Sequence, residues 1–549
     1  MELSSYLVDY LRANQKAYDY QHQPIVNSFE IDDLALQVGK FYEKIRKVVD
    51  WKEENALRRG SITRALKRNL VGQFYGFAQT YTKEQNKQVS QVIVFELMRS
   101  GYFNNQLINT QKVDEVAAII FKYAVILQEI HKKKSNSANR KDAKEKIKFQ
   151  TWILQIASCE LEACLAPNYK TQALVQLMCS AMKQRIKLLP KNFITEEQVQ
   201  KYILIAVWRA LFEADDYFVA YQLITAEFPQ LTKNQTINEN NDYEAFFKAK
   251  QQIFKELNTK VGRSFLSLAN KYDAAYRLIG DINKEFNCES VADGEKAWQD
   301  EEKVEKLFNE IYDRRYKSLK KRLLRTSLWS TLSILAANAF SVAAIEGPVA
   351  ALMGLDFTWF SIAMDILIPS VAMFFLVIII RPPPAENKAV LWQEVQKVFR
   401  AQKTDDVYEI RQRGKTKNRV LQTFFYATTL IAGAVGLWAM YKAFEISGLP
   451  WTSIYLNVVY LTMVLFASLN IRHKSTELTV YEKSSFFDFI LDIFSIPLAR
   501  IGQWFSKKWK EYNVFSVFFS LLVDAPLSLF ISFIEDWRDF LKEKKAEIR

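Results

Sequence analysis

The sequence predicts an all-α protein: a large N-terminal cytoplasmic helical domain, built as a bundle or an irregular solenoid, followed by a multi-pass α-helical membrane domain. Two observations support this prediction. Only 15 Gly and 12 Pro occur among 549 residues, which disfavours sandwiches and barrels and fits long helices. Residues 326–345 then form a run of 20 without any charge, long enough to cross a hydrocarbon core about 30 Å thick.

The first 302 residues predict two helical subdomains, 1–130 and 150–302. Apolar residues recur at helical spacing from Leu34 to Val49 in the first subdomain. In the second, Pro167, Pro190 and Pro229 each follow an apolar periodic segment, where proline ends a helix. Residues 131–149 between them are polar, basic and poor in apolar anchors, which predicts an exposed loop or a frayed helix start.

Residues 303–325 predict a basic juxtamembrane helix. Its cations would contact anionic lipid headgroups and mark the cytoplasmic flank of the membrane domain. The net charge of +13 has no recognised nucleic-acid module beside it, so we expect lipid rather than nucleic acid as the counterion. The cations that gather toward the end of this helix are Arg314, Arg315, Lys317, Lys320, Lys321, Arg322 and Arg325.

Residues 326–471 predict four membrane spans, at 326–345, 357–380, about 421–441 and about 451–471. The loop 381–419 carries ten Lys or Arg against five acids, whereas the loop 346–356 carries two acids and no base. Because positive loops remain inside, the N-terminal domain, the loop 381–419 and the chain after residue 471 should be cytoplasmic. The expected location is the inner (plasma) membrane.

Residues 472–549 predict amphipathic helices that are interfacial or re-entrant. The segment 485–498 is too short to span, and Asp488 and Asp492 lie one turn apart on one face. Segment 513–534 is long enough to span, but Asp524 and Pro526 in its middle predict two short helices broken there, with a fifth span as the alternative. Basic and aromatic residues between them should lie at headgroup depth: Trp504, Lys507, Lys508 and Trp509.

Asp365 is the sharpest candidate for chemistry because it lies inside the second expected span. A carboxylate at that depth costs several kcal/mol and must be paired, protonated or in contact with water. One interpretation is a structural hydrogen bond to the first span, for instance to Asn338. The other is an ion or proton site helped by backbone that Pro369 frees. The structural interpretation is preferred because no second acid lies in the adjacent spans.

The sequence contains no motif for catalysis. The four cysteines form no CxxC pair, the three histidines are isolated, and P-loop, dinucleotide, nucleophile-elbow and kinase signatures are absent. We therefore expect no enzyme, no cofactor and no metal site. The first hypothesis is a membrane-anchored scaffold that binds unidentified protein partners, with a homo-oligomer as one form of that assembly. The alternative is an oligomeric channel or transporter that uses Asp365. A lipid enzyme would need more than Asp488 and Asp492.

Several segments together suggest a family. They are FYEKIRKVVDWKEENALRR at 41–59, RRYKSLKKRLLR at 314–325, DILIPSVAMFFLVIIIRPP at 365–383, RIGQWFSKKWKEYNVF at 500–515 and EDWRDFLKEKK at 535–545. In these the chain resembles a multi-pass membrane-protein family of reduced-genome (candidate-phyla) bacteria that has no known activity. The resemblance implies a cytoplasmic helical domain followed by a few spans, and it implies no catalytic residues.

Overall fold

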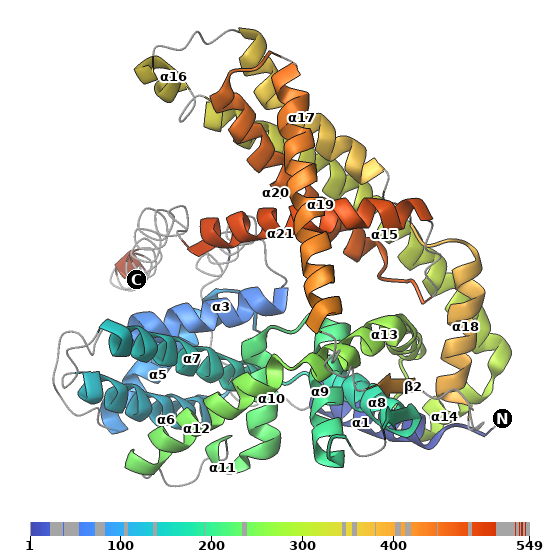
Figure 1. The fold of residues 1–549 in the computed structure, drawn as a ribbon. Coiled ribbons are helices and arrows are strands. Elements are labelled where there is room, and N and C mark those ends of the chain that lie inside the picture. The colour runs from blue at the N-terminus through green and yellow to red at the C-terminus, as the bar shows by residue number, and fades with distance from the viewer. Residues whose placement is uncertain are drawn as a thin grey trace.

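The computed structural model describes residues 2–21, 37, 54–71, 83–103, 108–134, 140–190, 193–232, 239–342, 347–353, 359–378, 380, 382–400, 408–411, 419–446, 448–480, 486–511 and the single positions 533, 537, 540, 541 and 544. The described chain is almost entirely helical, as the sequence predicts, with one pair of short strands. Figure 1 shows a broad layer of helices that contains the N-terminus and a group of long helices that rises from it.

The broad layer is a helical domain with one connected core. α1 packs on α8 and α14, α6 packs on α7 and α12, and α9 packs on α13, so the two expected subdomains share this core. The helices are α1 (Ser5–Gln21), α3 (Glu54–Leu66) followed by a π-helical turn (Lys67–Val71), α5 (Lys83–Arg99), α6 (Thr110–Lys134), α7 (Arg140–Leu165), α8 (Tyr169–Arg185), α9 (Glu196–Phe212), α10 (Asp216–Glu227), α11 (Pro229–Thr232), α12 (Glu239–Leu257), α13 (Lys260–Phe286) and α14 (Val291–Gln299).

Polar side chains define several helix starts. The Thr195 hydroxyl accepts a hydrogen bond from the backbone N–H of Gln198, and the Gln198 side chain accepts one from the backbone N–H of Thr195, which makes a capping box for α9. Asp215 caps α10 by accepting from the backbone N–H of Phe218 at 2.8 Å. Such caps satisfy amide donors that the first helical turn leaves without partners.

The expected loop 131–149 is largely helical, which corrects the prediction. α6 continues to Lys134 and α7 begins at Arg140, so only residues 135–139 of that segment lie outside the described helices. The sequence RKDAKEKIK at the start of α7 is rich in Lys and also contains Arg, Ala and Glu, all of which have high helix propensity. This propensity outweighs the lack of apolar anchors.

The segment between the second and third apolar helices joins the core of the helical domain. It contributes α18 (Glu386–Phe399), which packs on α13 and on α15 (Glu301–Ser341), and β2 (Tyr408–Arg411), which pairs in parallel with β1 (Ile186–Leu189). Neither strand was predicted. Pro190 was expected to end a helix, but it follows β1, because α8 already ends at Arg185.

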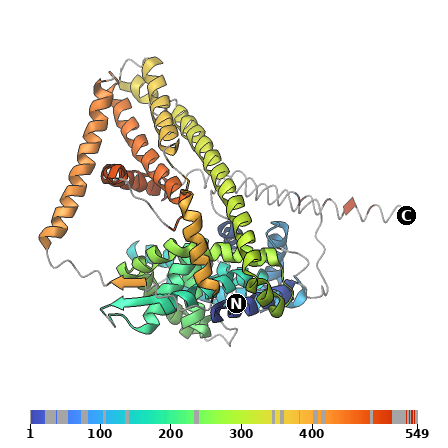
Figure 2. The same cartoon turned by 90° about the vertical axis from the view of Figure 1, so that its right-hand side faces the viewer.

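The long helices alternate in direction. α15 (Glu301–Ser341) runs unbroken for 41 residues from the helical domain into the apolar region, so the basic helix and the described part of the first expected span are one element. α16 (Gly347–Met353) lies at the far end, α17 (Trp359–Ile378) returns, α19 (Arg419–Ile446) leads away again, and α20 (Trp451–Ser475) returns (Figure 1). Figure 2 shows α15 and α19 diverging toward the helical domain.

Two of the four expected spans satisfy the criteria of length and apolar composition. Among the described residues, Ala427–Ile446 in α19 and Ser453–Ser475 in α20 are long and apolar enough to cross a membrane, and Ile362–Val377 in α17 is a shorter apolar helix. Only 22 % and 33 % of the two long segments are buried. The core helix of a soluble protein is mostly buried, whereas α19 leaves many apolar side chains exposed and α20 leaves most of its apolar side chains half-buried.

α21 (Phe486–Glu511) is longer than the expected helix at 485–498. It continues through the basic and aromatic stretch and keeps Pro497 inside the helix. It packs on both α19 and α20 and crosses them in Figure 1. The expected break at Asp524 and Pro526 lies outside the described residues.

Candidate functional site

Asp365 is buried between two apolar helices. Its side chain lies on α17, is 3 % exposed, and accepts a hydrogen bond from Nδ2 of Asn457 on α20. Asn457 is 1 % exposed, and its Nδ2 also donates to the backbone carbonyl of Ser453 at 3.0 Å. One amide group therefore links the carboxylate of one helix to the backbone of another.

The surroundings of this contact are apolar. Met364 and Ile368, on either side of Asp365 in α17, pack against a cluster of Phe444 from α19, Ile454 from α20 and Leu449 from the connection between these helices. A polar contact is strengthened in such a medium, and an uncompensated charge would be costly there.

Pro369 lies inside α17, four residues after Asp365. Proline has no N–H, so the hydrogen bond that a regular helix would make to the Asp365 carbonyl is missing. The neighbouring Ser370 hydroxyl donates to a different carbonyl, that of Ile366, at 2.8 Å. The predicted weak point of the helix therefore coincides with the buried acid.

Asn338 is not the observed partner of Asp365, which corrects the expectation. It is buried on α15 at 1 % exposure, but its Nδ2 makes no hydrogen bond within the described part of the chain. The partner is Asn457, which the sequence analysis missed. The sequence did place Asn457 inside an apolar segment, and buried polar groups need partners, so Asn457 was one of several polar residues that could have been named.

The basic residues of α15 separate into two groups. The first group pairs with acids: Arg314 lies 2.5 Å from Glu285, Arg315 pairs with Asp281, and Arg322 pairs with Glu477. These arginines therefore help to attach α15 to α13 and to the segment after α20, a role that the lipid interpretation did not foresee.

The second group stays exposed and lies along one face of α15. Lys317, Lys320, Lys321 and Arg325 make no ion pair with any described residue. Continuing along the same face at spacings of three and four residues, the exposed side chains become apolar: Leu324, Leu328, Leu332 and Leu335, with Trp329 beside them. This face changes from cationic to apolar within about two helical turns.

Glu477, just after α20, connects three elements. Besides Arg322, its carboxylate lies 3.6 Å from both Arg277 of α13 and Arg315 of α15. The next residues are held as well, because Asn387 of α18 donates to the carbonyl of Leu478 and accepts from the N–H of Val480 at 2.9 Å. We call residues 476–480 with these partners the junction.

α21 approaches α20 with backbone against backbone. A Cβ at Gly502 would lie 2.1 Å from the Thr462 carbonyl oxygen, so only glycine fits there. Asp492 of α21 pairs with Arg472 at 3.0 Å, which gives this acid a structural partner. Trp504 is 56 % exposed, whereas the side chains of Lys507, Lys508 and Trp509 lie outside the described set.

Chemically reactive groups are sparse in the part of the chain that the structure describes. No group of three or more His, Cys, Asp or Glu side chains there could hold a metal ion. Burial raises the pKa of the Cys159 thiol, and it raises the pKa of Cys164 to about 11 and of Cys179 to about 12. These cysteines stay protonated near neutral pH and are poor nucleophiles.

Comparison with protein-family models, with curated proteins and with solved structures finds no match to this chain. The resemblance to the family of candidate-phyla bacteria therefore stays a prediction that rests on the quoted segments.

Proposed function

We propose that the protein is a membrane-anchored helical scaffold of the inner (plasma) membrane. In this proposal α15, α17, α19 and α20 span the bilayer, and the helical domain lies in the cytoplasm. The supporting observation is the apolar surface that all four helices leave exposed. It includes Leu328, Trp329 and Leu332 on α15, Phe360, Leu367 and Phe375 on α17, Leu430, Ile431 and Trp438 on α19, and Trp451 and Tyr455 on α20. Apolar patches of this extent mark contact with lipid or protein.

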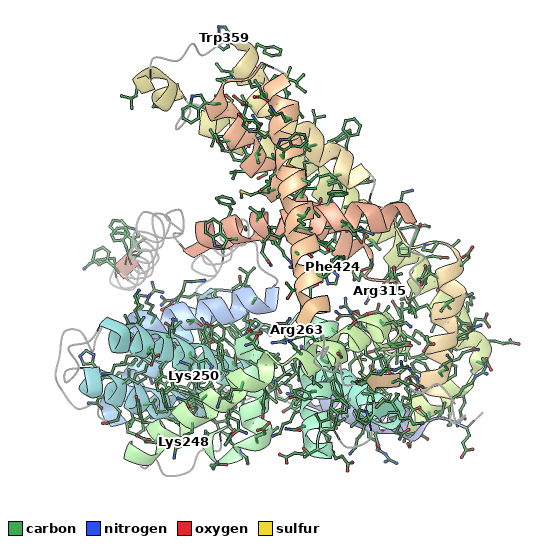
Figure 3. The ribbon with its side chains drawn as sticks, in the orientation of Figure 1. Lys248, Lys250, Arg263, Arg315, Trp359 and Phe424 are labelled. Atoms are coloured by element: carbon green, nitrogen blue, oxygen red, sulfur yellow. The ribbon has the colours of Figure 1, made fainter. Side chains whose placement is uncertain are left out.

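The regions that share the core of the helical domain support the proposed orientation in the membrane, with this domain in the cytoplasm. The N-terminal domain, the segment of α18 and β2, and residues 478–480 contribute to one core. They are the three regions that the positive-inside rule assigns to the cytoplasm. In Figure 3, Phe424 lies near this core and Trp359 at the opposite end of the apolar helices, both largely exposed. Aromatic side chains at both ends fit two membrane interfaces.

The scaffold role rests on the helical domain and on its attachment. The junction fixes α20 to α13, α15 and α18, so the domain is held at a set position relative to the proposed spans. A fixed cytoplasmic domain suits the positioning of partner proteins. Lys317, Lys320, Lys321 and Arg325, exposed below the apolar face of α15, would contact anionic headgroups.

The scaffold role is tested in cells with the full chain. Crosslinking in intact membranes followed by mass spectrometry identifies neighbours of the helical domain, and deletion of the gene should release those neighbours from the membrane fraction. Alkaline carbonate extraction should leave the protein itself in the membrane. If deletion changes the location of none of the crosslinked proteins, the scaffold role is refuted.

A second candidate function is an oligomeric channel or transporter. It is favoured by one observation, the buried contact of Asp365 with Asn457 beside Pro369. Ion flux into liposomes that contain the purified protein tests it, with Asp365→Asn as the variant and Asp492→Asn as the control. Flux that is absent, or equal in both variants and the wild type, excludes a transport role for Asp365.

A further inference from the structure

A cleft of about 460 Å³ opens in the helical domain, and neither proposed function uses it. Its walls come from α1, α8, α13, α14 and α15, together with the end of α9. Ligand pockets in proteins typically range from about 300 to 1,000 Å³, so this volume suits a small molecule.

The lining of the cleft favours an organic anion. The described residues of the wall include four basic side chains, Lys170, Arg277, Lys284 and Arg315, against one carboxylate, Asp281. Side-chain amides and hydroxyls supply neutral donors and acceptors: Asn14, Gln15, Thr171, Asn283, Asn287 and Ser290. Tyr10, Tyr18, Phe212 and Leu174 add aromatic and apolar surface. This combination fits a molecule with one anionic group on a partly apolar body.

Two of the four cations also belong to the junction. Arg277 lies 2.9 Å from Asp273 and donates to the Ala210 carbonyl at 2.6 Å, and Arg315 pairs with Asp281. Both lie 3.6 Å from Glu477, beyond the usual hydrogen-bond range of about 2.7–3.2 Å. Arg277 therefore lies closer to Asp273, and Arg315 closer to Asp281, than either arginine lies to Glu477.

We propose that the cleft binds a small organic anion whose phosphate or carboxylate contacts Arg277 and Arg315 in competition with Glu477. Planar guanidinium groups bind both kinds of anion with two parallel hydrogen bonds. Lys170 and Lys284, both exposed, add favourable charge at the rim. Because Glu477 also links α13 and α15 to α20, occupancy of the cleft would loosen the junction, and the loosened junction would in turn favour binding.

The test uses the full chain in detergent micelles, where binding does not depend on the scaffold proposal. Isothermal titration calorimetry is run with three probes: inorganic phosphate, adenosine 5′-monophosphate and succinate. Phosphate alone tests the anion subsite, the nucleotide adds an aromatic body, and succinate distinguishes carboxylate from phosphate. We expect at least one probe to bind.

Matched variants locate the site. Lys284→Ala should weaken binding by up to about fivefold, because it removes one favourable charge at the exposed rim of the cleft. Lys248→Ala removes the same charge from α12, well away from Arg315 in Figure 3, and should leave binding unchanged. Glu477→Gln should tighten binding, since it removes the competing carboxylate. Arg277 is not substituted because its bond to the Ala210 carbonyl supports the fold.

Three results would overturn the proposal. If none of the three probes binds, the cleft is not an anion site. If Lys284→Ala and Lys248→Ala change binding equally, the effect is general electrostatics and not the cleft. If Glu477→Gln binds the probe no more tightly than the wild type, the competition with Glu477 is wrong.

Discussion

The junction gives the sharpest test of how the helical domain is attached. Glu477→Gln keeps the size of the side chain and removes the charge that Arg277, Arg315 and Arg322 share. Two unit charges 4 Å apart interact by about 4 kcal/mol at an effective dielectric constant of about 20. Glu477 is 22 % exposed and Arg322 is 54 % exposed, so solvent and salt reduce this value. We expect local opening at the junction to become easier by about 2 kcal/mol, between the values for exposed and buried ion pairs.

Amide hydrogen exchange measures this opening directly. The N–H of Val480 donates to the Asn387 side chain and should be protected while the junction is closed. A loss of about 2 kcal/mol corresponds to roughly 30-fold faster exchange. Glu305→Gln is the matched control, because Glu305 is exposed on the same helix, α15. Equal exchange at Val480 in both variants would show that Glu477 does not hold the junction.

Three further outcomes are expected. Gly502→Leu should detach α21 at a cost above about 3 kcal/mol, because no side chain fits against the facing backbone, and limited proteolysis in micelles should cleave α21 faster than in Gln503→Leu, whose site is exposed. Burial raises the pKa of Asp273 to about 7 despite its ion pair, so the folded state retains a proton that the unfolded chain loses near 3.8. Its contribution to stability therefore falls as pH rises from about 4 to 7. The denaturation midpoint of Asp273→Asn should rise relative to that of the wild type over the same pH range, and a constant difference would contradict this. Lys122→Met should cost about 3–5 kcal/mol in urea denaturation because it leaves Glu160 buried without its cation, and an unchanged midpoint would argue against a charged pair.

The helical architecture was predictable because it depends on local signals. Low Gly and Pro content, helical spacing and the uncharged run after Arg325 are properties of the sequence alone. They correctly gave an all-α chain and a helix over 303–325. Helix boundaries were harder to predict. At 131–149 the polar composition suggested a loop, but the Lys-rich stretch from Arg140 is helical because its residues have high helix propensity.

The contacts between distant segments could not be read from the sequence. Burial of Asp365 required some partner, but several polar residues in the adjacent spans could have served, and only the packing of α17 on α20 selects Asn457. The run IKLL at 186–189 is too short for its periodicity to distinguish strand from helix. Arg322 is separated from Glu477 by more than 150 residues, so the sequence did not indicate their ion pair, and the expected role of Arg322 was contact with lipid headgroups.

α15 contains neither glycine nor proline from Glu301 to Ser341, so it has no residue at which a helix commonly kinks. Forty-one residues extend about 60 Å, and the lower half is packed in the core of the helical domain. A tilt of about ten degrees at the apolar end would displace the other end by about 10 Å at this length. α15 is therefore a continuous, stiff connection between the two parts of the molecule. If its apolar half lies in a bilayer as proposed, a change in bilayer thickness that tilts this half would also move the helical domain.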